Sequence, residues 1–187
     1  MRFQKVRERL IFASKWVRIY DDEVLMPDGS RGYYTRVASA SAEGGAHVVP
    51  RLPDGRVLLI KANRYPAGED IWEFPRGIPD PGESFEEAAK RELFEDSGLK
   101  VSKLSFLAYL RADGGILSTR NHVFVAEVPD GAQKDLRFPA DEGIFEGRFM
   151  LPDDVGALIA AGDTVDGTAL ATLMLLRVQR PGALADG

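Results

Sequence analysis

The segment Gly77–Leu99, GIPDPGESFEEAAKRELFEDSGL, constrains the fold most because it carries the signals for both ends of one helix. Ser84 and Glu87 form a capping-box pattern, in which each side chain accepts a hydrogen bond from a backbone N–H at the helix start. Gly98 suits the left-handed backbone conformation that commonly ends a helix. The sequence therefore predicts a helix of about 12 residues that begins at Phe85 and follows a glycine-rich loop.

The same helix carries an acidic cluster. Glu92, Glu95 and Asp96 lie at spacings of three and four, so we expect their carboxylates to project from adjacent turns and converge. Like charges so close together repel one another unless a cation neutralises them, and oxygen ligands suit Mg²⁺ or Mn²⁺. Arg91 is spaced to pair with Glu87 or Glu95 and to hold this face in place. The alternative interpretation is an acidic surface helix that keeps the protein soluble.

The spacing within this segment resembles the Nudix box, G-x5-E-x7-R-E-U-x-E-E-x-G-U, in which U is apolar. Every specified position matches except Asp96, where the pattern has glutamate. The resemblance to the Nudix hydrolase family implies an α/β fold, an α/β/α sandwich with a mixed sheet. It also implies cleavage of a nucleoside diphosphate linked to another group, with Mg²⁺ or Mn²⁺ as cofactor. The metal ligands that it implies are Glu83, Glu92, Glu95, Asp96 and the backbone carbonyl of Arg76, with Arg91 orienting the carboxylates.

The region before the box resembles the branch of the family that hydrolyses ADP-ribose and nucleotide sugars. In that branch a strand with an arginine precedes a W-E-x-P-x-G turn, which here is Arg64 followed by Trp72–Gly77. The resemblance implies that Arg64 grips the substrate diphosphate, because a guanidinium can donate two parallel hydrogen bonds. Trp72 and Arg76 are the further substrate-binding candidates. A solvated loop charge is the alternative interpretation of Arg64.

Residues 1–42 are expected to form an antiparallel β-sheet extension, with the Nudix domain over residues 43–187. A Pro-Asp-Gly turn separates the strand-like stretches within Leu10–Met26 and Tyr33–Ser39. The resemblance implies that this extension builds a homodimer whose aromatic side chains clasp the base. The candidates are Trp16, Tyr20, Tyr33 and Tyr34, although aromatic residues in strands more often belong to a core or an interface.

The remaining elements follow from periodicity and turn signals. The expected strands are 46–51, 56–61, 105–110, 122–128 and 145–151, and the expected helices are 153–161 and 167–180. Residues 61–84 are interpreted as a functional loop because they are rich in glycine and proline. Loop 111–120 lacks the proline that many ADP-ribose pyrophosphatases carry after the box, and it would meet the distal sugar.

An acidic loop precedes the strand at 145–151, where the resembled branch often supplies a catalytic base. Glu142 is the candidate, with Asp141 and Glu146 as the next choices. A solvated acidic loop explains the same residues.

Composition narrows the possible functions. The 187 residues contain no cysteine, which excludes disulfides and thiolate metal sites. The two histidines, His47 and His122, lie in apolar runs and are interpreted as structural. A net charge of −5 argues against a nucleic-acid partner. No apolar run reaches the length of a membrane span, and MRFQKVRERL lacks the apolar core of a signal peptide, so we expect a cytoplasmic protein.

Three functional hypotheses remain. The first is hydrolysis of ADP-ribose or a related nucleotide sugar to a nucleoside monophosphate and a sugar phosphate. The second keeps the Nudix chemistry but takes nucleoside triphosphates, dinucleotide polyphosphates or capped RNA. The third is a non-catalytic nucleotide-binding module, which only the replacement at Asp96 favours.

Overall fold

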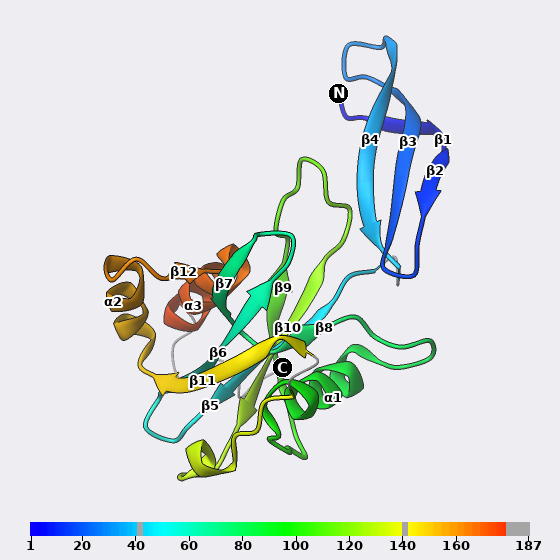
Figure 1. Cartoon of the computed structure of the whole chain (residues 1–187). Helices are drawn as coiled ribbons and strands as arrows, with labels where there is room; N and C mark the ends of the chain where they lie inside the picture. Colours follow the sequence, from blue (N-terminus) through cyan, green and yellow to red (C-terminus); the bar gives the residue numbers. More distant parts are fainter. Residues whose placement is uncertain (41–42, 140–141, 179–187) are drawn as a thin grey trace.

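Two β-sheets are formed by different parts of the chain (Figure 1). The computed structural model describes residues 1–40, 43–139 and 142–178. The smaller sheet is antiparallel and contains β1 (Gln4–Arg7), β2 (Leu10–Ala13), β3 (Val17–Leu25) and β4 (Arg31–Ser39). Strands β1 and β2 pair with opposite ends of β3, while β4 pairs along the whole of it. The expected N-terminal antiparallel sheet is therefore present.

The larger sheet is mixed and runs in the order β12-β7-β6-β5-β10-β9, with β11 paired to β6 and β8 to β5. Its central pair, β5 and β10, is parallel, whereas β6 pairs antiparallel with both β7 and β11. The strands are β5 (Ala46–Arg51), β6 (Val57–Arg64), β7 (Glu69–Glu73), β8 (Arg76–Gly77), β9 (Ser105–Leu110), β10 (Asn121–Glu127), β11 (Ile144–Met150) and β12 (Thr164–Val165).

Helices cover both faces of this sheet. Helix α1 (Phe85–Ser97) packs its Ala88, Ala89 and Leu93 on one face, while α2 (Val155–Ala160) and α3 (Gly167–Val178) pack on the other. Consecutive strand residues point to opposite faces, so Val48 lies in the core under α1 and Val49 in the core under α2 and α3. Burial on both faces explains why the central strands are continuously apolar. The expected α/β/α sandwich is confirmed.

Two expected assignments differ from the structure, and a third is described only in part. Residues 61–84 are not one loop, because β6 continues to Arg64 and β7 and β8 follow. Strand β7 has the sequence EDIWE, whose charged residues are not typical of a strand. It forms a strand because it pairs antiparallel with β6. The expected helix 153–161 is a 3-10 turn, Pro152–Asp154, followed by α2. The expected helix 167–180 is α3, and its last two residues lie outside the described part of the chain.

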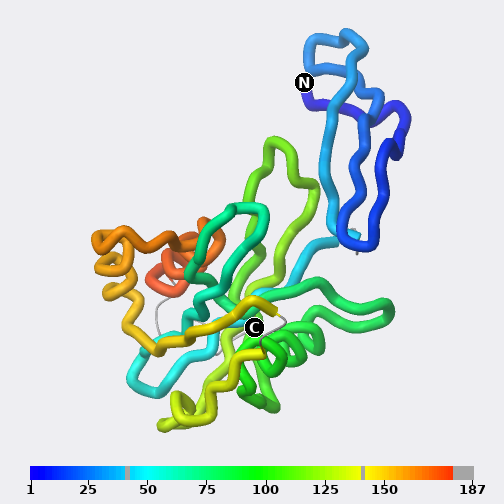
Figure 2. Tube along the Cα trace, in the orientation of Figure 1, coloured from blue at the N-terminus to red at the C-terminus, as the bar shows by residue number. Residues whose placement is uncertain are grey.

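The loop between β9 and β10 lies beside β4, as Figure 2 shows. The Val37 N–H donates to the Ile116 carbonyl at 2.9 Å, and the Ser118 N–H donates to the Val37 carbonyl at 2.9 Å. The Tyr34 hydroxyl donates to the Gly115 carbonyl, also at 2.9 Å. These contacts fix the N-terminal sheet relative to the rest of the chain.

Candidate active site

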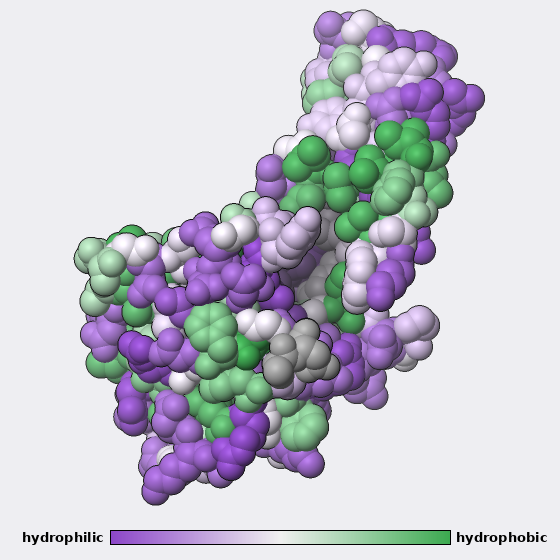
Figure 3. Space-filling view, in the orientation of Figure 1, coloured by the Kyte–Doolittle hydropathy of each residue, from purple (hydrophilic) through white to green (hydrophobic). Residues whose placement is uncertain are grey.

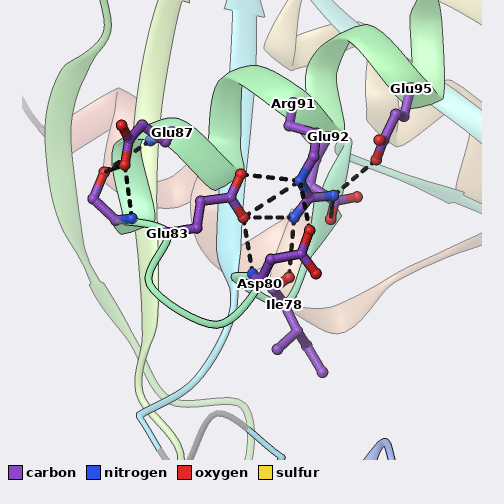
Figure 4. A network of polar contacts seen from close by, with 8 residues as sticks. Ile78, Asp80, Glu83, Glu87, Arg91, Glu92 and Glu95 are labelled. Carbon is purple, nitrogen blue, oxygen red and sulfur yellow. Dashed lines mark hydrogen bonds and ion pairs between the residues drawn. The ribbon is translucent and has the colours of Figure 1, made fainter.

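The start and end of α1 are as the sequence predicts. The Ser84 hydroxyl accepts the Glu87 N–H at 3.2 Å, and the Glu87 carboxylate accepts the Ser84 N–H at 2.9 Å (Figure 4). Gly98 ends the helix with φ 75°, in the left-handed region. The capping box is complete, so α1 begins at Phe85. The start of the helix determines the direction in which each later side chain points.

Arg91 is the centre of an ion-pair network on α1, which Figure 4 shows. Its guanidinium donates to Glu83 at 2.9 and 3.0 Å, to Glu92 at 2.7 Å and to Glu95 at 2.8 Å. It also donates to the Ile78 carbonyl at 3.1 Å, which ties the preceding loop to the helix. The bonds from Arg91 hold the pKa of Glu83 below its usual range. The expected pairing of Arg91 with Glu95 is confirmed.

Asp96 is buried, with 4% of its surface exposed. Its Oδ2 atom accepts the backbone N–H of Arg76 at 3.1 Å. Burial raises the pKa of Asp96 to about 7, and the nearby charges of Glu92 and Glu142 act in the same direction. Arg64 and the Arg76 N–H oppose this rise. The shorter side chain that replaces the box glutamate is therefore held against the backbone of β8.

Gly77 lets Glu92 approach the same backbone. A Cβ atom at residue 77 would lie 1.9 Å from Glu92 Oε1, so Glu92 can hold this position only beside a glycine. Burial raises the pKa of Glu92, and the hydrogen bond from Arg91 opposes the rise. Glu92 and Asp96 thus both lie against the two residues of β8.

The structure does not bring the three acidic box residues together as a ready metal site. Within residues 1–40, 43–139 and 142–178, no three His, Cys, Asp or Glu side chains are placed to hold a metal ion. Arg91 neutralises the charge of Glu92 and Glu95, because its Nη1 atom donates to both carboxylates. Asp96 instead accepts the Arg76 N–H. The donor chemistry nevertheless fits a divalent cation, since carboxylate and backbone carbonyl oxygens are the ligands that Mg²⁺ prefers.

Arg64 is not a solvated loop charge. It lies at the end of β6 and donates to Oε1 of Glu73, at 3.0 Å from Nε. The Glu73 side chain is 1% exposed and also accepts a 2.7 Å bond from Arg76 through Oε2. Arg76 in turn contacts Asp166 at 3.3 Å. Neither Glu73 nor Asp166 is a site candidate from the sequence, although Glu73 lies within the W-E-F-P turn and Asp166 precedes a helix.

An open cleft of about 920 Å³ brings together residues from distant segments. Its lining includes Trp16, His47, Arg64, Arg76, Thr119, Asn121 and Glu142. Figure 3 shows that apolar surface gathers on the N-terminal sheet near the rest of the molecule. The cleft therefore joins the diphosphate-binding candidate, the box backbone, the candidate base and one aromatic residue of the N-terminal sheet.

The position of Trp72 differs from the one expected for a substrate-binding residue. It is 1% exposed and packs in the core under α2 and α3, so it does not line the cleft. The reason is the alternation of β7, which turns Trp72 to the face opposite α1. As a substrate-binding candidate, Trp72 is therefore wrong.

The other aromatic candidates differ in their surroundings. Tyr20 lies under the Arg36 guanidinium at 3.9 Å, and Tyr34 contacts Phe3 edge to face. Tyr33 is exposed and lies near Arg9. These three contacts lie within the N-terminal sheet, which leaves Trp16 as the candidate that lines the cleft.

The acidic candidates and histidines are placed as follows. Glu142 is exposed and lines the cleft, Glu146 pairs with Arg148, and Asp141 lies outside the described residues.

His47 is buried, and this burial lowers its pKa to about 3. His122 stacks on Phe85 at 3.6 Å between ring centres. Both histidines are packed side chains, as expected, although His47 also borders the cleft.

Comparison with known proteins identifies the family of the chain. The family model described as the NUDIX domain matches residues 43–173. The chain therefore belongs to the Nudix family and is a Nudix pyrophosphohydrolase. Enzymes of this family generally use a divalent metal.

Relatives match almost the whole chain at low identity. An ADP-ribose pyrophosphatase of Bacillus subtilis is 24% identical over 93% of this chain and 92% of its own length. A CMP-5'-(N-acetyl-N-hydroxy-3-aminopropyl)phosphonate hydrolase of Streptomyces rubellomurinus is 26% identical over 97% of this chain and 88% of its own. A crystal structure of an ADP compounds hydrolase has the same fold, with a TM-score of 0.70 at 21% identity, covering 95% of this chain and 93% of its own.

Among the described residues, none of the helices has the length and hydropathy needed to cross a bilayer.

Proposed function

We propose that this enzyme hydrolyses the pyrophosphate bond of a nucleoside diphosphate sugar, with ADP-ribose as the first candidate. The products would be a nucleoside monophosphate and a sugar phosphate. The observation that carries the proposal is the placement of Arg64 and Glu142 in one cleft, beside the backbone that contacts Glu92 and Asp96. The similarity to an ADP-ribose pyrophosphatase covers 93% of this chain, which is more than the Nudix domain alone.

Arg64 is suited to bind the diphosphate. Its side chain is about one third exposed and borders the cleft. The buried carboxylate of Glu73 fixes its orientation, so less side-chain entropy is lost when substrate binds. Arginine grips phosphate oxygens with paired hydrogen bonds, which a lysine cannot reproduce.

The carboxylates of α1 are proposed to hold Mg²⁺, with Mn²⁺ as the alternative. The residues are Glu92, Glu95 and Asp96, with Glu83 in support and the Arg76 carbonyl as a further ligand. A divalent cation at this position would neutralise phosphate charge and lower the pKa of a bound water. Arg91 orients the carboxylates through the bonds that it donates to Glu83, Glu92 and Glu95.

Glu142 is proposed as the base that accepts the proton of the attacking water. It borders the cleft, and its charge acts on the pKa values of both Glu92 and Asp96. An exposed carboxylate beside the cleft suits a general base, which accepts a proton from a water molecule within hydrogen-bonding distance.

Residues 1–42 are proposed to be a dimerisation extension of a Nudix domain that spans residues 43–187. Strand β2 supports this, because all four of its residues are exposed although Leu10, Ile11 and Phe12 are apolar. A cytoplasmic location stays a prediction from the sequence.

The test is a hydrolysis screen with purified protein and Mg²⁺. We expect release of AMP from ADP-ribose, and Glu92→Gln should abolish it while leaving the helix folded. Nucleoside triphosphates, dinucleotide polyphosphates and capped RNA belong in the same screen, and faster release of pyrophosphate from triphosphates would favour the second hypothesis. No turnover of any nucleotide sugar or dinucleotide would exclude the proposal.

A cytidine nucleotide is the second candidate substrate. The specific observation is the relative named for a CMP-linked phosphonate, which matches this chain over 97% of its length. A CDP-sugar in the same screen distinguishes the two bases, because hydrolysis faster than that of ADP-ribose would change the assignment.

A further inference from the structure

The side chain of Arg76 links β8 to the start of α3. Its Nη2 atom donates to Glu73 at 2.7 Å and to Asp166 at 3.3 Å, and its Nη1 atom donates to Asp166 at 3.3 Å and to the Thr168 hydroxyl at 3.1 Å. Asp166 is 90 residues away from Arg76 in the sequence. The contact therefore exists only because the tertiary fold brings α3 beside the box loop.

Asp166 is itself held by the helix that it precedes. Its Oδ1 atom accepts the Thr168 N–H at 2.9 Å and the Ala169 N–H at 3.3 Å, and its carbonyl accepts the Leu170 N–H at 3.0 Å. This is the bonding of an N-cap residue. The carboxylate is consequently a fixed point for the Arg76 guanidinium rather than a mobile surface charge.

The backbone at Arg76 contacts both buried box carboxylates. The Arg76 N–H donates to Asp96 at 3.1 Å, and Gly77 leaves the space that Glu92 occupies. Strand β8 is only two residues long and pairs with β5 at Ala46 and His47. Such a short strand gains little from its own ladder, so side-chain contacts help to set where its backbone lies.

We propose that Asp166 is a positioning residue for the metal-binding backbone and acts through Arg76. Asp166 and Glu73 both accept hydrogen bonds from the Arg76 guanidinium and so restrict its position. A fixed Arg76 side chain in turn restricts the β8 backbone, which contacts Asp96 and Glu92. Outer contacts of this kind typically change metal affinity or activity by about 10- to 100-fold. The inference rests on the proposed function, because it assigns Asp166 to the same site.

The test measures binding of Mn²⁺ alone, by the electron paramagnetic resonance of the free ion, next to ADP-ribose kinetics. Asp166→Asn keeps an oxygen that can cap α3 but removes the charge that Arg76 binds. We expect Mn²⁺ affinity to fall about 10-fold. We also expect kcat to fall, whereas KM for the nucleotide should change by less than about twofold. Asp166→Ser, which also caps helices, should give the same result if Asp166→Asn folds poorly.

Two controls separate this role from a general effect on α3. Asp153→Asn removes the charge that forms an exposed ion pair with Arg177. Arg177 lies on α3, and Asp153 lies in the turn before α2, so this variant should leave Mn²⁺ affinity unchanged. In an Arg76→Ala background, Asp166→Asn should cause no further loss of affinity. An equal loss in that background, or none in the wild-type background, would overturn the inference.

Failure of the positioning role and failure of the proposed function give different results. If the wild type binds Mn²⁺ and Asp166→Asn weakens that binding, but no nucleotide sugar is hydrolysed, the proposed substrate is wrong and the positioning role stands. If the wild type does not bind Mn²⁺ at all, the positioning role fails, and the hydrolysis screen alone decides the proposed function.

Discussion

Asp96 shows how burial decides the effect of a one-methylene difference. The carboxylate lies between α1 and β8, is 4% exposed, and accepts the Arg76 N–H at 3.1 Å. A glutamate here would need additional volume in a closely packed region. The aspartate is therefore matched to the position of β8 in this chain, and it keeps the negative charge that the box pattern provides.

Replacing Asp96 by asparagine removes that charge while keeping the shape and an acceptor for Arg76. We expect kcat/KM for the nucleotide substrate to fall by about 10- to 100-fold, since a metal would lose a charged ligand. The measurement is steady-state hydrolysis at saturating Mg²⁺. Glu86→Gln, which alters an exposed acid that pairs with Lys90 on the same helix, should have no such effect. Equal activity in Asp96→Asn would exclude a direct role for this charge.

At the scale of the element, α1 is the part that local signals determine most completely. Its capping box and its left-handed glycine act within a few residues of each end. Strands β7 and β8 lack such signals, because their residues are charged or small and their hydrogen bonds depend on β6 and β5. This is why the sequence predicts the helix to the residue and describes the two strands as a loop.

Ser84→Ala removes the hydroxyl that accepts the Glu87 N–H, while the backbone N–H of residue 84 can still donate to the Glu87 carboxylate. We expect it to lower the free energy of unfolding by about 1 kcal/mol, as loss of an N-cap typically does. Urea unfolding followed by circular dichroism measures this change. Ser84→Asp keeps a capping oxygen and should retain most of the stability. A loss as large in Ser84→Asp would mean that the cap is not the cause.

At the scale of the whole molecule, the N-terminal sheet exposes apolar side chains that a monomer does not bury. We expect the protein to sediment at twice its chain mass of 20.5 kDa. Ile11→Glu, on β2, should dissociate the dimer and weaken hydrolysis if the partner contributes to the site. Ile159→Glu, an exposed apolar position on α2, is the control and should leave the mass unchanged. A wild-type monomer would contradict this prediction.

His47 makes stability depend on pH. Burial lowers its pKa to about 3, and Arg76 acts in the same direction while Asp166 opposes it. In the unfolded chain a histidine takes up a proton below about pH 6.5, whereas the folded protein resists this proton. The contribution of His47 is therefore complete above pH 6.5 and is lost as the pH falls, at about 1.4 kcal/mol per pH unit.

The check compares urea unfolding at pH 7.5 and pH 5.5. His47→Gln should reduce the difference between the two unfolding free energies by about 1 kcal/mol. His122→Gln removes a less buried ring and should change the difference less. If His47→Gln leaves the difference unchanged, the folded protein accepts the proton as readily as the unfolded chain.

The sequence by itself determined α1, the spacing of the box residues, the N-terminal antiparallel sheet and the Nudix class. These depend on capping bonds and periodicities that act between near neighbours in the chain. Only the tertiary structure decided that Trp72 is buried, that Glu142 borders the cleft, and that Glu73 and Asp166 bind Arg76. Such contacts depend on the order of strands in the sheet and on the helices that cover it, because residues up to 90 positions apart meet only when those layers pack.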